Sequence, residues 1–192
     1  MDKEILIINN DSVFFPKLVK IIDNFGFIPI PIHFTELFKP TTYNTYSGIV
    51  LSGGPHDTHD NAEMDSERKI IRDVRIPVLG VCFGMQLLAM MYGGKIKQLP
   101  KKDAGTKMYE VISLEQNGLL CGLPSKFLVA GSNEFVIESV GSELVVIGKS
   151  RFGIEIIRHK KRQIYGVQFH PEIYATKTDG LKVLENFIKG LR

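Results

Sequence analysis

The sequence has few of the features that mark secreted or membrane proteins. Its 192 residues include only two cysteines, Cys82 and Cys121, which cannot form the dense disulfide framework of a small secreted protein. No apolar run is long enough to span a bilayer, and the first residues lack the pattern of a signal peptide. We therefore expect a protein of the reducing cytoplasm that does not bind a membrane.

The chain also lacks a strong charge of either sign. The formal net charge is +3 at pH 7 and the basic residues are scattered, so nucleic acid is not an expected partner. No repeat, low-complexity tract or linker divides the sequence. With 192 residues and a hydrophobic content of 44%, the chain can bury a full core. We expect residues 1–192 to form a single domain.

The most informative stretch runs from Pro77 to Gly94. Pro77–Val81 is a short apolar run typical of a strand buried on both faces, and Phe83–Tyr92 has the composition of a buried helix. Cys82 lies at the junction, within a Gly-x-Cys-x-Gly pattern. A nucleophile elbow exposes its reactive side chain at such a turn, and the helix N-terminus stabilises a thiolate. Most lone cysteines are small packed hydrophobes, but the glycines and the junction favour a nucleophile here.

A cysteine nucleophile needs a base, and among the five histidines only His170 has a suitable context. It follows the expected strand Ile164–Phe169 and precedes Pro171, which favours an extended backbone. Side chains two apart in an extended chain point the same way, so Glu172 can lie beside His170. The alternative is a strand-end histidine with an unrelated glutamate. Cys82, His170 and Glu172 form the predicted nucleophile–base–orienter triad.

Three sequence blocks together resemble the class I (triad) glutamine amidotransferases. They are Gly48–Pro55, Gly80–Gln86 and Gly166–Glu172, and their order and separations match one complete amidotransferase domain. The resemblance implies that L-glutamine is hydrolysed to glutamate and ammonia through the cysteine triad. It implies no metal and no cofactor.

The resemblance also implies roles for residues around the triad. The backbone N–H groups of Gly54 and Phe83 would form the oxyanion hole. The implied glutamine-binding residues are Gly53, Gln86, Ser132, Asn133 and Phe135. The chain departs from the family pattern at two positions. Asn133 stands where many relatives have a histidine-containing turn, and Met85 replaces the usual histidine of the elbow motif.

The hydrophobic pattern predicts an α/β fold with a mostly parallel, open, twisted sheet flanked by helices, as in flavodoxin-like proteins. Ile5–Ile8 and Gly48–Leu51 are expected to be central strands, whereas the prolines of Phe27–Ile32 favour an edge strand. Active sites in such sheets lie at the carboxyl ends of the strands, where the Ser52–Pro55 loop and Cys82 are expected.

The second half of the sequence predicts an antiparallel extension of this sheet. Its short β-like runs are Lys95–Leu99, Thr106–Leu114, Lys126–Ala130, Phe135–Glu138, Leu144–Gly148 and Ile154–His159. His159–Arg162 is expected to form a solvated hairpin turn, and His56–Asp60 a solvated loop rather than a metal site. The predicted helices outside the elbow begin near Phe14, cover Ala62–Val74 and follow Gly180.

The chain is too short to hold a synthetase as well, so it resembles a glutaminase subunit that supplies ammonia to an ATP-dependent synthetase. Leu51–Pro55 and Thr106-Lys107 resemble the amidotransferase subunits of two-subunit GMP synthases. Asn10–Phe14 instead resembles the corresponding subunits of anthranilate and aminodeoxychorismate synthases. Further alternatives are a stand-alone γ-glutamyl hydrolase and a non-catalytic regulatory subunit.

Overall fold

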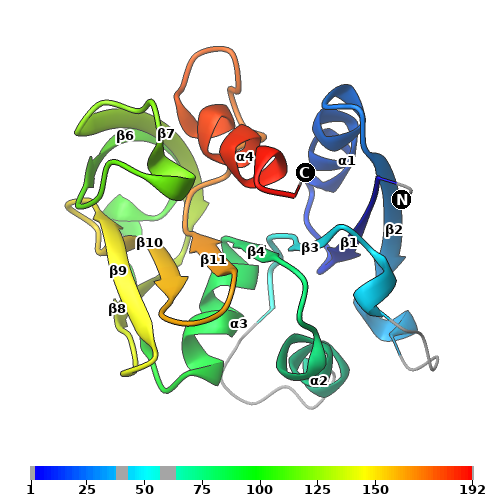
Figure 1. Ribbon diagram of the computed structural model, residues 1–192. Coiled ribbons are helices and arrows are strands. Elements are labelled where there is room, and N and C mark those ends of the chain that lie inside the picture. Colours follow the sequence, from blue (N-terminus) through cyan, green and yellow to red (C-terminus); the bar gives the residue numbers. More distant parts are fainter. Residues whose placement is uncertain (1–2, 38–42, 57–63, 192) are drawn as a thin grey trace.

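The structure is a computed structural model that describes residues 3–37, 43–56 and 64–191 (Figure 1). It contains an 11-stranded sheet in which nine strands follow the order β2-β1-β3-β4-β11-β10-β9-β6-β7, while β8 pairs with β10 and β5. The strands are β1 (Glu4–Asn9), β2 (Ile28–His33), β3 (Gly48–Leu51), β4 (Val78–Val81), β5 (Lys95–Gln98), β6 (Gly105–Ser113), β7 (Lys126–Asn133), β8 (Phe135–Ser139), β9 (Leu144–Lys149), β10 (Ile154–His159) and β11 (Ile164–Val167). The α-helices are α1 (Phe15–Asn24), α2 (Asp65–Asp73), α3 (Phe83–Met91) and α4 (Gly180–Lys189).

The first half of the sheet is parallel, because its strands are joined through crossovers rather than hairpins. β1 pairs with both β2 and β3, and β4 pairs with both β3 and β11. β2 lies at the edge, as its two prolines predict, since proline cannot donate to a neighbouring strand. β3 and β4 are buried along their whole length, as expected of strands covered on both faces.

Helices cover both faces of this parallel half, and the alternation of side chains along each strand builds two core layers. In β1, Ile5 and Ile7 belong to the layer that contains side chains of α1 and α4. Leu6 and Ile8 belong to the opposite layer, with side chains of α2 and α3. Figure 1 shows the sheet between these two pairs of helices.

The second half forms the predicted antiparallel extension. β10 pairs with β11 and β9 in antiparallel register, and β6 pairs with β7 from Gly105 opposite Asn133 to Ile112 opposite Lys126. The prediction of a mostly parallel sheet with an antiparallel extension is therefore confirmed. β7 continues three residues beyond the predicted end at Ala130, so that Asn133 lies within a strand.

In the β10–β11 hairpin, the predicted solvated turn holds for Lys160 and Lys161, which are exposed, but not for His159 at the end of β10. His159 is only 6% exposed, and its Nδ1 accepts hydrogen bonds from the backbone N–H groups of Lys161 and Arg162. The Arg162 guanidinium donates to the carbonyl oxygens of Ile71 and Val74, at the end of α2. The basic turn thus fastens the hairpin to a helix of the parallel half.

The helices match the predicted segments with shifted ends. α1 begins at Phe15 and is followed by Gly26 at φ 77°, a left-handed conformation that suits glycine at a helix end. α2 covers Asp65–Asp73, and the first two residues of the predicted Ala62–Val74 lie outside the described residues. Within the described ranges, no helix has the length and apolar character needed to cross a bilayer.

Candidate active site

Cys82 occupies a strained turn between β4 and α3. Its φ is 50° and its ψ is −104°, a conformation that residues with a side chain rarely adopt. The turn is fixed on both sides, since the Cys82 N–H donates to the Val167 carbonyl at 2.8 Å and the Gln86 N–H donates to the Cys82 carbonyl at 3.0 Å. Strain of this kind marks functional turns, and a nucleophile elbow has this strand–turn–helix form.

The two glycines that flank the elbow allow close packing around it. A Cβ on Gly80 would lie 2.5 Å from the backbone of Gly84, and one on Gly84 would lie 2.7 Å from Leu51 Cβ. Neither glycine has a positive φ, whereas Cys82 does. The glycines therefore let α3 approach β4 and β3 closely, and the cysteine takes the strained backbone.

His170 and Glu172 form a buried pair after β11. His170 Nδ1 lies 2.7 Å from Glu172 Oε1, and the two residues are 3% and 4% exposed. The His170 N–H donates to the Ala130 carbonyl at 2.8 Å, which ties the histidine to β7. The segment is a turn rather than the expected extended chain, because the Ile173 N–H donates to the His170 carbonyl at 3.1 Å. The predicted proximity is present, but a turn produces it.

Gly53 packs against the side chains of both Cys82 and His170. A Cβ on Gly53 would lie 2.7 Å from His170 Cε1 and 3.6 Å from Cys82 Cβ. Burial disfavours the imidazolium, but the Cys82 sulfur and the Glu172 carboxylate outweigh it and raise the pKa of His170 to about 10. This environment favours a protonated imidazole at His170.

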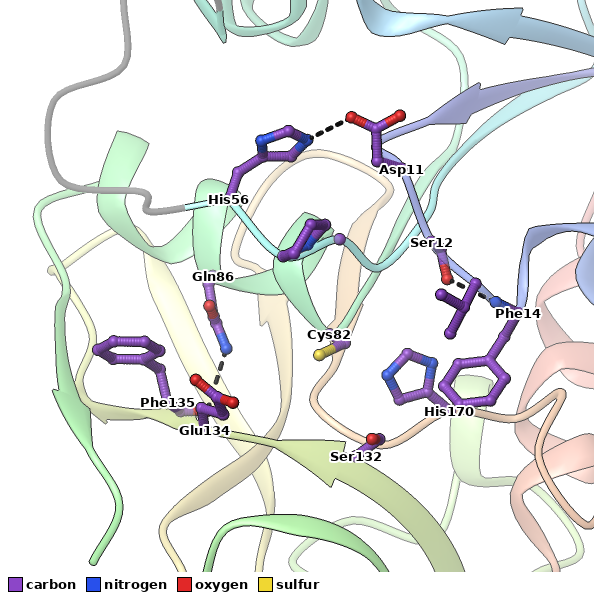
Figure 2. Close-up of a pocket in the computed structure, with 13 residues that line it drawn as sticks. Asp11, Ser12, Phe14, His56, Cys82, Gln86, Ser132, Glu134, Phe135 and His170 are labelled. Atoms are coloured by element: carbon purple, nitrogen blue, oxygen red, sulfur yellow. Dashed lines mark hydrogen bonds and ion pairs between the residues drawn. The ribbon is translucent and has the colours of Figure 1, made fainter. Parts of the chain in front are cut away.

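A cleft of about 270 Å³ opens above these side chains. Figure 2 shows the Cys82 sulfur between the His170 ring on one side and Gln86 and Glu134 on the other. The predicted site residues that line this cleft are Gly54, Cys82, Gln86, Ser132, Phe135 and His170. A concave site with a few convergent polar groups suits a small ligand.

The remaining predicted residues lie outside the lining. Glu172 lies behind His170, and Phe83 begins α3, where the first backbone N–H groups have no acceptor within the helix. Gly53 lies against Cys82 and His170. Asn133 is 6% exposed and directs its carboxamide at the Cys82 sulfur from within the protein.

Gln86 is held at the wall of the cleft by two acceptors. Its Nε2 donates to the Phe135 carbonyl at 3.1 Å and to Gln168 Oε1 at 3.4 Å. Gln168 in turn places its Nε2 3.7 Å from the Cys82 sulfur. Gln168 was not predicted as a site residue, although it lies inside the sequence block Gly166–Glu172.

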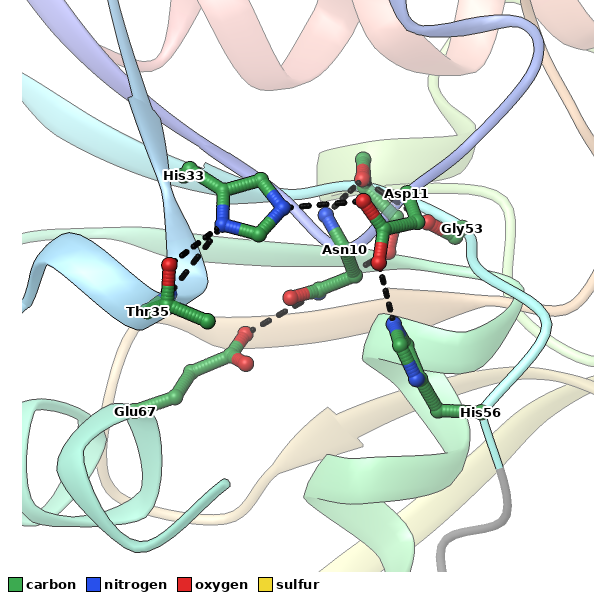
Figure 3. Close-up of polar contacts among 8 residues, drawn as sticks. Asn10, Asp11, His33, Thr35, Gly53, His56 and Glu67 are labelled. Atoms are coloured by element: carbon green, nitrogen blue, oxygen red, sulfur yellow. Dashed lines mark hydrogen bonds and ion pairs between the residues drawn. The ribbon is translucent and has the colours of Figure 1, made fainter. Parts of the chain in front are cut away.

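The rim of the cleft carries an acidic residue between two histidines. Asp11 Oδ1 lies 2.8 Å from His33 Nε2, and Asp11 Oδ2 lies 3.1 Å from His56 Nε2 (Figure 3). The hydrogen bond from His33 is the main cause that lowers the pKa of Asp11, and His56 adds to it. The expected solvated loop is therefore wrong for His56, which packs its ring against Phe34 and Phe83, while residues 57–60 lie outside the described residues. Among the described residues, no metal-binding group of three such side chains occurs.

A second polar group lies beneath the glycine loop. The Asn10 N–H donates to Ser52 Oγ at 2.9 Å, and Asn10 Nδ2 donates to Ser52 O at 3.3 Å and to Glu67 Oε1 at 3.2 Å. Figure 3 shows the Glu67 carboxyl directed at the Asn10 side chain. Glu67 is fully buried, and burial raises its pKa to about 7, against the hydrogen bond from Asn10. A Cβ on Gly54 would lie 2.0 Å from the Asn10 carbonyl oxygen, so this group sets the path of the loop.

Other lining residues were missed from the sequence. Asp11, Ser12 and Phe14 follow β1, and the Phe14 ring lies 5.1 Å from the His170 ring in an edge contact. The available signal was positional, because the loop after β1 starts at the same sheet edge as the glycine loop and Cys82.

Comparisons with known proteins agree with the fold and the elbow. A family model for class I glutamine amidotransferases matches residues 6–191. The chain is 34% identical over 193 residues to a glutamine-hydrolysing GMP synthase subunit of Methanopyrus kandleri, covering 96% of this chain and 97% of that protein. It is 38% identical over 143 residues to the corresponding subunit of Methanothrix thermoacetophila, covering 74% of this chain and 75% of that protein.

Solved structures share the architecture. A protein of Thermoplasma acidophilum assigned as a GMP synthase subunit superposes with a TM-score of 0.86 at 24% identity, covering 100% of this chain and 94% of that chain. A glutamine amidotransferase of Thermotoga maritima gives a TM-score of 0.79 at 18% identity, covering 99% of this chain and 82% of that chain. At these identities the likeness shows the fold. The family model and the curated relatives together show that the chain belongs to the class I glutamine amidotransferase family.

Proposed function

We propose that this protein is a glutaminase subunit that hydrolyses L-glutamine to glutamate and ammonia and supplies the ammonia to a separate ATP-dependent synthetase of the GMP synthase type. The observation that supports it best is the arrangement of Cys82 and His170. A strained cysteine elbow and a buried histidine–glutamate pair meet at one cleft, in a chain that belongs to this family. Cys82, His170 and Glu172 are the proposed catalytic residues.

In the first step, the Cys82 thiolate attacks the side-chain amide carbon of glutamine and forms a tetrahedral intermediate. The backbone N–H groups of Gly54 and Phe83 stabilise its oxyanion, a contribution of roughly 3–4 kcal/mol per donor in comparable sites. The Gly54 loop and the start of α3 both lie at the carboxyl edge of the sheet, which allows the two donors to converge.

His170 carries the proton in both half-reactions. As the tetrahedral intermediate collapses, the protonated imidazole gives its proton to the leaving nitrogen, which departs as ammonia and leaves a thioester on Cys82. Neutral His170 then removes a proton from water, which attacks the thioester and releases glutamate. Glu172 holds Nδ1 at 2.7 Å, so that Nε2 is the nitrogen that exchanges the proton.

Substrate contacts follow from the side chains at the cleft. Gln86, Ser132 and Phe135 are proposed to hold the amino-acid end of glutamine, since all three line the cleft around Cys82. Gly53 leaves room for the substrate and for His170, because a larger residue would collide with the ring. Backbone groups near Asn133 are proposed to join these substrate contacts, while the Asn133 side chain points toward the Cys82 sulfur.

The synthetase partner and its type are supported by the relatives. Two relatives that the chain matches over most of their length are named as glutamine-hydrolysing subunits of GMP synthases. A GMP synthase of Thermosipho melanesiensis matches at 36% identity over 74% of this chain but only 27% of its own length. The same unit therefore forms part of a longer protein there, and we propose that a separate chain supplies the remainder here.

We further propose that the protein is cytoplasmic and binds neither membranes nor nucleic acid. Both cysteines, Cys82 and Cys121, are free thiols, and Cys121 is exposed. Unpaired exposed thiols are usual in a reducing compartment. Confocal localisation of a tagged chain tests this directly, and a secreted or membrane-bound protein would overturn it.

The catalytic assignment is tested by removing the sulfur. Cys82→Ala should lower glutamine hydrolysis by at least about 10⁴-fold, because the covalent route is lost, while circular dichroism and thermal unfolding stay unchanged. Cys121→Ser is the matched control, since it removes an exposed thiol away from the cleft and should keep full activity. Retained glutaminase activity in Cys82→Ala would end the assignment.

The partner is tested by measuring ammonia release with and without candidate synthetases. Stimulation by the ATP-dependent synthetase subunit of a GMP synthase supports the GMP synthase type. Stimulation only by chorismate-using partners would support an anthranilate or aminodeoxychorismate synthase subunit. Full activity alone would support a stand-alone γ-glutamyl hydrolase, and inactivity with every partner a regulatory subunit.

A further inference from the structure

A chain of hydrogen bonds leads from the Cys82 sulfur into the antiparallel extension. Cys82 Sγ lies 3.5 Å from Asn133 Oδ1, at the end of β7. Asn133 Nδ2 lies 3.4 Å from the Tyr109 hydroxyl on β6, and this hydroxyl lies 2.9 Å from Glu155 Oε2 on β10. The triad uses none of these three side chains beyond the sulfur.

All three side chains that extend this series of hydrogen bonds from Cys82 are buried. Asn133 is 6% exposed, Tyr109 7% and Glu155 0%. Among the residues that the structure describes, no cation pairs with Glu155, and the groups that contact its carboxyl are Tyr109 and Ser150, whose Oγ lies 2.6 Å from Oε1. A buried ionised carboxylate without a cation is expensive, so the neutral form of Glu155 is accessible.

Glu155 also has a route to solvent protons. Ser150 and Tyr109 line a second pocket on the surface of the extension, together with Met108, Glu110 and Lys126. Ser150 is only partly buried. The chain of hydrogen bonds therefore runs from the catalytic cleft at one end to a solvent-exposed pocket at the other.

The direction of donation along the chain depends on the proton of Glu155. When Glu155 is ionised, the Tyr109 hydroxyl donates to it and must accept from the Asn133 amide nitrogen. Asn133 then presents its oxygen to Cys82. An amide oxygen can only accept, so this arrangement favours a sulfur that carries its proton.

When Glu155 is protonated, every donation reverses. The carboxyl donates to the Tyr109 oxygen, and Tyr109 donates to the Asn133 oxygen. The Asn133 amide, turned by half a rotation about its last bond, presents N–H to the sulfur and stabilises a thiolate. The two states contain the same number of protons, since one proton has left the sulfur and one is bound to Glu155.

We propose that this chain couples the charge on the Cys82 sulfur to the protonation of Glu155, with Tyr109 as the link. Glu155, Tyr109 and Asn133 are thus positioning residues for the nucleophile. The proposal rests on the proposed function only in taking Cys82 as that nucleophile.

The pKa shifts of Glu155 and Tyr109 agree with this role. Burial is the main cause that raises the pKa of Glu155 to about 7, against hydrogen bonds from Ser150 and Tyr109, so both its states occur near neutral pH. Burial and the charge of Glu155 raise the pKa of Tyr109 well above its usual value, so this hydroxyl stays protonated. The sulfur also faces His170 and the Gln168 amide, which the variants below leave unchanged.

The test measures the reactivity of the sulfur directly. The rate of alkylation of Cys82 by iodoacetamide follows the thiolate fraction, and a Cys121→Ser background removes the exposed second thiol. Glu155→Gln imitates the protonated form of Glu155, because the carboxamide donates a hydrogen bond to Tyr109 at every pH. Relative to the parent, Glu155→Gln should alkylate at an equal rate near pH 5.5 and about threefold faster or more at pH 8.

Tyr109→Phe is the decisive control, since it cuts the link and keeps the ring. In the Tyr109→Phe background, Glu155→Gln should leave the alkylation rate unchanged at both pH values. The proposal would be overturned if Glu155→Gln and its parent alkylate at the same rate at pH 8 with Tyr109 present. It would also be overturned if the threefold rate difference persists in the Tyr109→Phe background, which would mean a direct electrostatic effect of Glu155 on the sulfur. Asn133→Ala cuts the chain at its other end and replaces Tyr109→Phe if that variant unfolds.

Alkylation requires no glutamine turnover, which separates this proposal from the proposed function. A protein that shows the coupling yet does not hydrolyse glutamine would refute the function alone. A protein that hydrolyses glutamine but shows no effect of Glu155 on alkylation would refute the proposed coupling alone.

Discussion

Gly53→Ala tests how tightly the catalytic histidine is held. The new Cβ would lie 2.7 Å from His170 Cε1, about 0.7 Å inside the 3.4 Å at which ordinary contact begins. The ring has little room to retreat, because its backbone N–H is bonded to Ala130 and its Nδ1 to Glu172. The substitution adds one methyl group and no charge, and Gly53 has no positive φ that would add backbone strain.

The expected effect is on catalysis rather than on folding. A displacement of about 1 Å at reacting groups lowers rates by about 10²-fold, so a shift slightly below that predicts a fall in kcat/KM of roughly 10–100-fold. The fall should appear mainly in kcat, since His170 acts on the transition state. Thermal unfolding should move by only a few degrees, because one ring shifts at the edge of a cleft.

The assay is steady-state ammonia release, with the thermal midpoint measured on the same preparations. Gly180→Ala is the matched control: its Cβ would lie 3.4 Å from Pro171 Cα and 3.5 Å from the Phe169 ring, ordinary contacts beside the same segment. It should keep kcat/KM within about twofold. Full activity of Gly53→Ala with an unchanged midpoint would refute the inference that His170 is rigidly placed against this loop.

Two further predictions concern buried carboxyl groups. Glu172→Gln should lower kcat by roughly 10⁴-fold, because a carboxamide can donate to Nδ1 and select the wrong tautomer of His170; ammonia release measures this, and a loss below tenfold would contradict the role of Glu172. Burial raises the pKa of Glu67 from 4.5 to about 7, so the folded state binds the extra proton between these values and wild-type stability falls as pH rises through this window. Glu67→Gln, which can still pair with Asn10, should therefore be more stable than wild type at pH 8 by on the order of 2 kcal/mol and equal to it near pH 4, as urea unfolding at both pH values would show.

The parallel half of the fold was predictable because its signals are local. β3, β4 and β11 are short, mainly apolar runs, and each is followed within three residues by a predicted site residue. Their carboxyl ends meet because the strands pair in parallel, with Val81 opposite Val167. The order of motifs along the sequence was therefore enough to bring Cys82 and His170 to one edge.

The geometry of the turns was less predictable. Pro171 restricts the residue before it, but the chain after it is free to turn, and a turn places Glu172 beside His170. The strain at the elbow falls on Cys82 and not on its glycines, which composition alone cannot reveal. His56 was expected in solvent because its neighbours in sequence are polar, whereas its ring contacts come from distant residues.

The buried polar groups were not predictable from local pattern. Glu155 is a charged residue between two isoleucines of β10, and its partner Tyr109 lies 46 positions away. Asn133 reaches the sulfur only because β7 continues to that residue and pairs with β6. These contacts depend on the register of antiparallel strands, which a single sequence does not fix.

The position of β11 has a consequence for how the chain acquires activity during synthesis. β11 is the final strand in sequence, yet it lies between β4 and β10 and is the only described strand that joins the parallel and antiparallel halves along the sheet path. Before residues 164–170 leave the ribosome, the two halves have no common strand, and His170 cannot reach Cys82. The nascent polypeptide thus carries the Cys82 thiol without its base. Unproductive glutamine hydrolysis cannot begin until β11 has inserted between β4 and β10.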